Sequence, residues 1–243
     1  MLPLHTGECC DGDFPALAAT MGACSVWQEL MVDNVSNPLD QLVLGVDKAL
    51  KTLTGAYQAA RPNPGLKASE SQMSADQQAH VAGLMRVNHT GEICAQALYE
   101  GQALAARSDE ARQVLLEAAE EERDHLAWCR ERLDELDAGP SVLNPLFYGA
   151  SFAMGVLTGL AGDKVSLGFV EATEDKVVEH IDRHLDALPE GDERSRAILD
   201  QMREDEQRHG ADALDRGGEV FPAPVKQVMT MVSRVMTETT YRV

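Results

Sequence analysis

The sequence predicts an all-α protein built around a bundle of four long helices. Helix-favouring residues dominate the composition, β-branched runs are scarce, and only 5% of the residues are aromatic. Four segments bounded by capping and breaking residues are near or above 25 residues long, and 25 residues span roughly 36 Å at about 1.5 Å per residue. Helices of that length pack side by side as a bundle.

The segment before the bundle is expected to contain one short helix. Residues 1–38 contain no Lys or Arg, and we interpret them as a poorly ordered N-terminal extension. Residues 39–73 are expected to form a short amphipathic helix, over about 39–53, followed by a linker that starts at the proline-rich stretch 61–65. The bundle domain is then expected over residues 74–243.

Start and stop signals bound each element of the bundle. Ser74 and Gln77 form a capping box for the first long helix, and Ser108 is a suitable N-cap for the second. Residues 143–161 contain no charged residue, and we expect an apolar crossover helix there between two halves of the bundle. The expected ranges are 74–107, 108–137, 164–188 and 192–215 for the long helices, with a short C-terminal helix over 225–239.

Charge and cysteine usage exclude several classes of function. The formal net charge of −19 argues against nucleic acid, because such binding depends on neutralising phosphates. The five cysteines are odd in number and form no C-x-x-C pair, so neither a disulfide framework nor a zinc knuckle is expected. No Lys or Arg precedes Lys48, which argues against a secretory or mitochondrial leader and favours a bacterial cytoplasmic product.

Two Glu-x-x-His motifs carry the functional prediction. One is Glu122-Arg-Asp-His125 and the other is Glu206-Gln-Arg-His209. Residues three apart on a helix share a face, so each pair can reach one metal ion. A single copy would be weak evidence, because a solvated polar helix face produces the motif by chance. Two copies on separate long helices are stronger evidence.

A further glutamate precedes each motif by one long helix. Glu92 lies 30 residues before Glu122, and Glu174 lies 32 residues before Glu206. The order is therefore Glu, Glu-x-x-His, Glu, Glu-x-x-His, one element per long helix, as in di-iron carboxylate proteins. Four hard carboxylates and two imidazoles suit two iron ions per chain, with manganese as a chemical alternative.

Three neighbouring residues are candidates for orienting the ligating histidines. Glu121 and Asp205 each directly precede the glutamate of a Glu-x-x-His motif, and His180 follows Glu174 on the third long helix. The alternative for each is an ordinary surface role. No catalytic residue is expected beyond the metal ligands and these three.

Longer stretches resemble the demethoxyubiquinone hydroxylases of ubiquinone biosynthesis. They are Arg-Val-Asn-His-Thr-Gly-Glu at 86–92, Tyr-Glu-Gly-Gln at 99–102, Glu-Glu-Glu-Arg-Asp-His-Leu at 120–126, Asn-Pro-Leu at 144–146 and Val-Glu-Ala-Thr-Glu at 170–174. Asp205-Glu-x-x-His209 matches as well, and the likeness spans about residues 39–243. The resemblance implies a ferritin-like fold with a di-iron site formed by Glu92, Glu122, His125, Glu174, Glu206 and His209.

The resemblance also implies an activity and a location. The expected reaction is hydroxylation of the ring of a polyprenyl demethoxy-benzoquinol, using O2 and electrons from an external donor such as NADH. The chain is expected at the cytoplasmic face of the bacterial inner membrane as a peripheral protein. It is expected to act as a homo-oligomer or with other ubiquinone-biosynthesis proteins. Residues 143–161 and the last helix would suit a membrane surface, or alternatively core or dimer contacts.

Two other classes of function stay open. One is a different ferritin-like di-metal protein, such as a ferroxidase, a catalase or another hydroxylase. The uncharged segment 143–161 argues against iron storage, which does not need it. The other class is a non-catalytic lipid-binding helical protein whose carboxylates face water.

Overall fold

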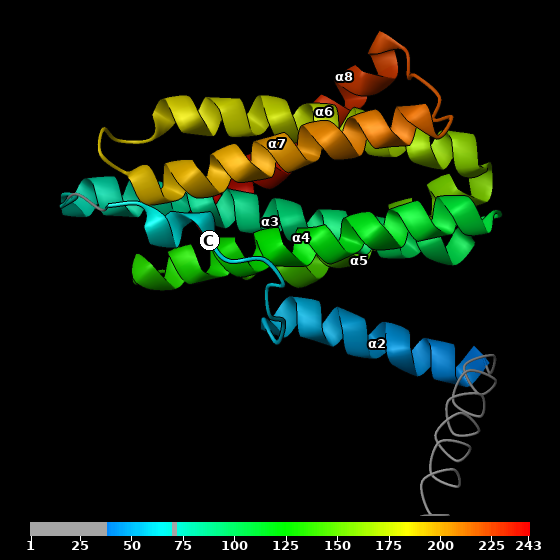
Figure 1. Cartoon of the computed structure of the whole chain (residues 1–243), viewed down its shortest axis with the longest axis horizontal. Helices are drawn as coiled ribbons and strands as arrows, with labels where there is room; N and C mark the ends of the chain where they lie inside the picture. Colours follow the sequence, from blue (N-terminus) through cyan, green and yellow to red (C-terminus); the bar gives the residue numbers. More distant parts are fainter. Residues whose placement is uncertain (1–37, 70–71) are drawn as a thin grey trace, which may run out of the picture. The chain divides into compact units, whose positions relative to one another are not determined.

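A computed structural model describes residues 38–69 and 72–243 (Figure 1). In this part of the chain the secondary structure is helical throughout, which confirms the all-α prediction. The predicted N-terminal extension lies, except for its last residue, outside the described residues. The elements are α2 (Pro38–Thr54), η2 (Pro64–Lys67), α3 (Ala75–Ala105), α4 (Asp109–Glu135), α5 (Asn144–Ala161), α6 (Asp163–Ala187), α7 (Glu193–Asp215) and α8 (Ala223–Thr240).

The four long helices α3, α4, α6 and α7 have 31, 27, 25 and 23 residues and run alongside one another (Figure 1). Their starts follow the capping residues. The Ser74 hydroxyl accepts a hydrogen bond from the backbone N–H of Gln77, whose side chain accepts one from the backbone N–H of Ser74. Ser108 caps α4 by accepting from the backbone N–H of Ala111. These contacts satisfy N–H groups that have no partner within their own helix.

The crossover helix α5 packs closely against α3 because glycines meet at the contact. A methyl group on Gly101 would overlap the carbonyl oxygen of Phe152, and one on Gly155 would overlap that of Leu98. On its other side α5 exposes leucines, among them Leu157, which is 62% exposed. Among the described helices, none has the combination of length and hydropathy that crossing a bilayer requires.

Two apolar clusters fill the bundle on either side of its middle. One contains Met85 of α3, Trp128 of α4 and Met202 of α7. The other lies toward the opposite end of the bundle and contains, among others, Leu98, Leu115, Leu167 and Ala213. Each long helix thus contributes apolar residues near both ends and leaves a stretch between them. The predicted metal ligands occupy that middle stretch.

The linker after α2 lies against the bundle and is called the strap here (residues 56–68). It includes η2, which is capped by the Asn63 side chain accepting from the backbone N–H of Gly65. Asn63 also donates to Glu131 of α4 at 2.7 Å. At Gly65 a methyl group would lie 3.0 Å from the carbonyl oxygen of Arg194, so the strap passes close to α7. The strap thereby connects to two helices that carry the Glu-x-x-His motifs.

Candidate metal centre

The six predicted ligands come from the middle of the four long helices. Each is almost completely buried: the most exposed, His209, has 6% of its surface accessible, while Glu122 and His125 have none. Burying four carboxylates together is unfavourable unless opposite charge compensates them. The residues are Glu92 on α3, Glu122 and His125 on α4, Glu174 on α6, and Glu206 and His209 on α7.

One half of the cluster surrounds His125. Candidate ligand atoms of Glu92, Glu122, His125 and Glu206 all lie within 4.8 Å of one another. The Nδ1 atom of His125 is 3.7 Å from Glu92 Oε2, 3.1 Å from Glu122 Oε2 and 3.0 Å from Glu206 Oε1. Three carboxylates therefore converge on one imidazole nitrogen, at distances that leave room for a cation between them.

The other half surrounds His209. Its Nδ1 atom is 3.2 Å from Glu122 Oε1 and 3.2 Å from Glu206 Oε2. Glu122 and Glu206 therefore each face both histidines. Glu174 interacts with Glu206 and His209, as Glu92 does with Glu122 and His125. Glu122 and Glu206 thus lie between the two histidines, with Glu92 on the His125 side and Glu174 on the His209 side.

The second nitrogen of each histidine has its own carboxylate partner, and the pairing crosses between helices. His125 Nε2 of α4 is 3.0 Å from Asp205 Oδ2 of α7. His209 Nε2 of α7 is 3.3 Å from Glu121 Oε2 of α4. Because a carboxylate only accepts, Nε2 donates in each pair and Nδ1 is left to bind a metal. Asp205 and Glu121 thus each contact one of the two histidines, and their orienting role stays a prediction.

His180, the third predicted orienting residue, has a different environment. Its ring centroid lies 3.9 Å from that of His184, one turn further along α6. Its Nε2 atom is buried without a hydrogen-bond partner among the described residues. Burial lowers the pKa of His180 to about 4 and that of His184 to about 2. An orienting role for His180 toward the cluster stays a prediction.

Electrostatics within the cluster indicate a need for positive charge. Burial raises the pKa of Glu92 and of Glu174 well above the usual range, and neighbouring carboxylates raise it further. Burial alone would also raise the pKa of Glu122, but the charge and hydrogen bonds of His125 lower it well below the usual range. Burial would lower the pKa of His209, yet hydrogen bonds to Glu122 and Glu206 raise it to about 11.

The donor atoms fit a metal site. Glu174 Oε2 is buried and has no hydrogen-bond partner among the described residues, while Glu122 Oε1 and Glu206 Oε1 are buried and face a histidine Nδ1 at 3.2 and 3.0 Å. Buried carboxylate oxygens without a donor are unusual, and cation coordination accounts for them. Carboxylate oxygens with imidazole nitrogens form a set that iron and manganese accept. The residues therefore fit a metal site.

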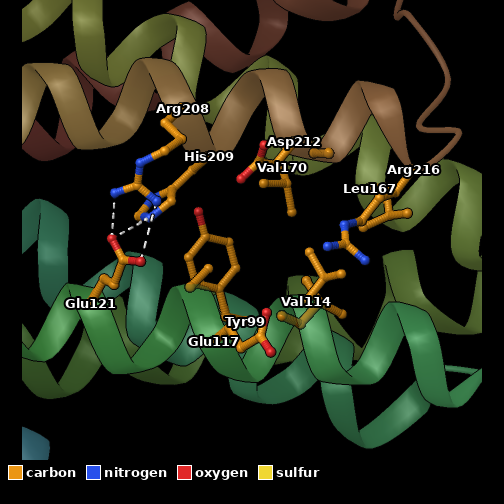
Figure 2. A pocket seen from close by; sticks show the side chains of 13 residues that line it. Tyr99, Val114, Glu117, Glu121, Leu167, Val170, Arg208, His209, Asp212 and Arg216 are labelled. Atoms are coloured by element: carbon orange, nitrogen blue, oxygen red, sulfur yellow. Dashed lines mark hydrogen bonds and ion pairs between the residues drawn. The ribbon is translucent and has the colours of Figure 1, made fainter.

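A cavity of about 120 Å³ adjoins the His209 half of the cluster (Figure 2). Tyr99 and His209 border it, and Figure 2 shows both side chains pointing into the space between α4 and α7. Charged side chains, including Arg208 and Asp212, form part of its wall. The apolar part of the lining is Val114, Leu115, Ala118, Leu167, Val170 and Ala213.

Two contact residues have no assigned role in the sequence analysis. The Tyr99 hydroxyl donates to Glu174 Oε1. Tyr99 lies seven residues after Glu92, on the same face of α3, so helical spacing could have indicated it. Arg61 of the strap donates to Asp205 Oδ2 at 2.8 Å. No local pattern marks Arg61, because Asp205 lies 144 residues away in the sequence.

A four-helix bundle that buries two Glu-x-x-His pairs and two further glutamates defines the class of ferritin-like carboxylate proteins. The model of the family described as ubiquinone biosynthesis protein COQ7 matches residues 79–240. The chain belongs to this family.

Curated relatives are more than half identical to this chain over the aligned residues. A protein of Stutzerimonas stutzeri (strain A1501), named 3-demethoxyubiquinol 3-hydroxylase, is 56% identical over 208 residues, which is 85% of this chain and 97% of the relative. A protein of Pseudomonas putida (strain GB-1) with the same name is 55% identical over 208 residues, with the same coverage. One of Pseudomonas paraeruginosa (strain DSM 24068 / PA7), again with that name, is 53% identical over 215 residues, 88% of this chain and 100% of the relative.

Proposed function

We propose that this chain is a 3-demethoxyubiquinol 3-hydroxylase, an enzyme of ubiquinone biosynthesis that uses two iron ions. The buried cluster of four glutamates and two histidines is the observation on which the proposal mainly depends. Relatives with more than half of their residues in common and nearly full coverage carry that name. The substrate class is a polyprenyl quinol, and the co-substrates are O2 and electrons from an external donor such as NADH.

Each residue has a defined task in this proposal. Glu92, Glu122, His125, Glu174, Glu206 and His209 would hold the irons, with Glu92 beside His125, Glu174 beside His209, and Glu122 and Glu206 facing both histidines. The irons would supply the redox chemistry by which O2 is activated.

The protein's own contribution is to position and shield this site. Asp205 and Glu121 fix the two imidazole rings, and Tyr99 fixes Glu174. The apolar clusters on both sides keep bulk water away and strengthen electrostatic interactions inside. The cavity beside Tyr99 and His209 gives a small reactant access to the cluster.

We further propose that the chain acts as a peripheral protein at the cytoplasmic face of the inner membrane. A polyprenyl quinol is confined to the bilayer, so the enzyme must meet it at the surface. The outer face of α5 exposes Leu146, Leu157 and Leu160, at 67%, 62% and 60%. α8 exposes Val228 and Met231, at 60% and 68%. Exposed apolar faces on amphipathic helices suit a membrane interface.

Lipid analysis of a strain that lacks this protein tests the proposed activity. We expect demethoxyubiquinone to accumulate, and plasmid-borne wild type to restore ubiquinone. His209→Ala should fail to restore it, because one imidazole ligand is missing. The matched control is His80→Ala, which removes a histidine that contacts Tyr241 and Ala187 away from the cluster. Normal ubiquinone in the deletion strain would rule the activity out and favour another di-metal function.

A further inference from the structure

The strap carries an arginine to the outer side of the metal centre. Arg61 Nε donates to Asp124 Oδ2 at 2.5 Å, and one terminal nitrogen donates to Asp205 Oδ2 at 2.8 Å. The guanidinium carbon lies 5.0 Å from the ring centroid of Trp128. The strap backbone is fixed at the same place, since the N–H of Ala60 donates to Asp124 Oδ1 at 2.6 Å. Arg61 is thereby anchored between α4 and α7.

Asp205 is the link between Arg61 and the predicted ligand His125. Its Oδ2 atom accepts from both Arg61 and His125 Nε2, and its Oδ1 atom accepts from Arg208 at 2.8 Å. Its side chain is 6% exposed. With both oxygens held by arginines, the carboxylate has one orientation, and the imidazole that donates to it is held with Nδ1 toward the cluster.

The two histidines are supported unequally. Glu121, the partner of His209, is held by Arg208 alone among the described residues, and its side chain is 33% exposed. Asp205, the partner of His125, is held by Arg208 and by Arg61 and is nearly buried. Loss of Arg61 therefore removes support from the His125 half and leaves the contacts of the His209 half in place.

We propose that Arg61 is a positioning residue for the metal position beside His125, acting through Asp205. The inference rests on the metal site of the proposed function. It adds that the strap, which lies outside the four bundle helices, completes one of the two metal positions. Changes to groups that orient a metal-bound histidine typically lower metal affinity by about 10- to 100-fold.

Cobalt titration of the full-length protein tests this. Co²⁺ added to chelator-treated protein should bind in two steps that its visible absorption resolves. In Arg61→Gln one step should weaken about tenfold, at the lower end of that range, and the other should stay within twofold. Arg61→Lys keeps the charge but cannot bridge two carboxylates, so it should restore part of the affinity.

Two control variants separate positioning from general damage. Arg203→Gln removes an arginine of α7 that pairs with Asp182 on the surface, and both cobalt steps should stay unchanged. Asn63→Ala loosens the strap without touching Arg61, so thermal stability should fall while both steps persist. If Arg61→Gln leaves both cobalt steps unchanged, or weakens both equally, the inference about Arg61 is wrong but the proposed metal site is unaffected. Wild-type protein that binds no cobalt would overturn the metal site as well.

Discussion

The hydroxyl of Tyr99 on α3 donates a hydrogen bond to Glu174 on α6, inside the bundle. Tyr99 has no accessible surface, and its hydroxyl borders the cavity next to His209. The contact ties the first and third long helices together at the metal centre. The second oxygen of Glu174, Oε2, has no hydrogen-bond partner among the described residues.

Replacing Tyr99 by Phe should weaken metal binding in the His209 half. The Glu174 carboxylate would lose its donor and the precision of its placement, so we expect about tenfold lower affinity in one cobalt step. Loss of a buried hydrogen bond should also lower the free energy of unfolding by about 1–2 kcal/mol. Titration and urea unfolding measure the two effects. An unchanged titration would mean that Tyr99 does not position Glu174.

Replacing Glu92 by Gln should stabilise the chelator-treated protein while abolishing full metal loading. Burial and the nearby Glu122 raise the pKa of Glu92, so its charge opposes folding when no cation is present. We expect a gain of about 1–3 kcal/mol in unfolding free energy. Unfolding with and without excess Co²⁺ measures both effects, and added metal should stabilise wild type more than the variant. A variant less stable than wild type in chelator would contradict this explanation.

Filling the cavity should slow turnover without removing metal. Ala118 lines the cavity from α4, and Ala118→Phe should occupy much of the space beside His209. We expect at least tenfold lower hydroxylation with unchanged iron content. Ala211→Phe adds the same bulk to an exposed position of α7 and serves as the control. Full activity in Ala118→Phe would mean that reactants use another route.

Stability should fall as the pH drops below about 6.5, with a contribution from the histidine pair of α6. Burial lowers the pKa of His180 to about 4 and that of His184 to about 2. A depressed histidine pKa means that the unfolded chain binds protons that the folded chain does not. The contribution of His180 and His184 to the free energy of unfolding is therefore complete above the unfolded-state pKa of about 6.5 and is lost as the pH falls below it.

The size of this effect can be measured by urea unfolding at pH 7 and pH 5.5. Wild type should lose about 2 kcal/mol more between these pH values than the double variant His180→Gln/His184→Gln, which lacks both titrating rings. Equal losses in the two proteins would show that the pair does not titrate on unfolding.

Membrane association should depend on the outer face of α5. Leu157→Glu places a charge on a side chain that is 62% exposed there. We expect several-fold less protein to sediment with vesicles of phosphatidylethanolamine and phosphatidylglycerol. Leu116→Glu, at a 38% exposed position of α4, should sediment like wild type. Equal sedimentation of all three proteins would argue against attachment through α5.

The bundle and the six clustered residues were predictable because their signals are local. Helix caps such as Ser74 lie within three residues of their partners, and Glu122 and His125 lie one turn apart. Observed helix ends differ little from the expected ones: α3 ends at Ala105, and the expected end was residue 107. The ligand roles and the domain boundaries at residues 38 and 73 stay predictions.

The contacts that hold the site were not predictable to the same degree. Asp205 and Glu121 could be proposed because each adjoins a motif, but the crosswise pairing depends on how α4 and α7 pack. Arg61 reaches the site from the strap, through a contact between residues 144 apart. Such contacts follow from tertiary packing, which one sequence without related sequences does not specify.

The crosswise pairing of Asp205 with His125 and of Glu121 with His209 has a consequence for assembly. The α3–α4 pair and the α6–α7 pair each carry three of the six clustered residues, and each supplies the acceptor for the other's imidazole. Sliding one pair by a single turn along the other would break both acceptor contacts at once. The chemistry of the centre therefore fixes the register of the two halves, and a correctly loaded site can form only in a correctly assembled bundle.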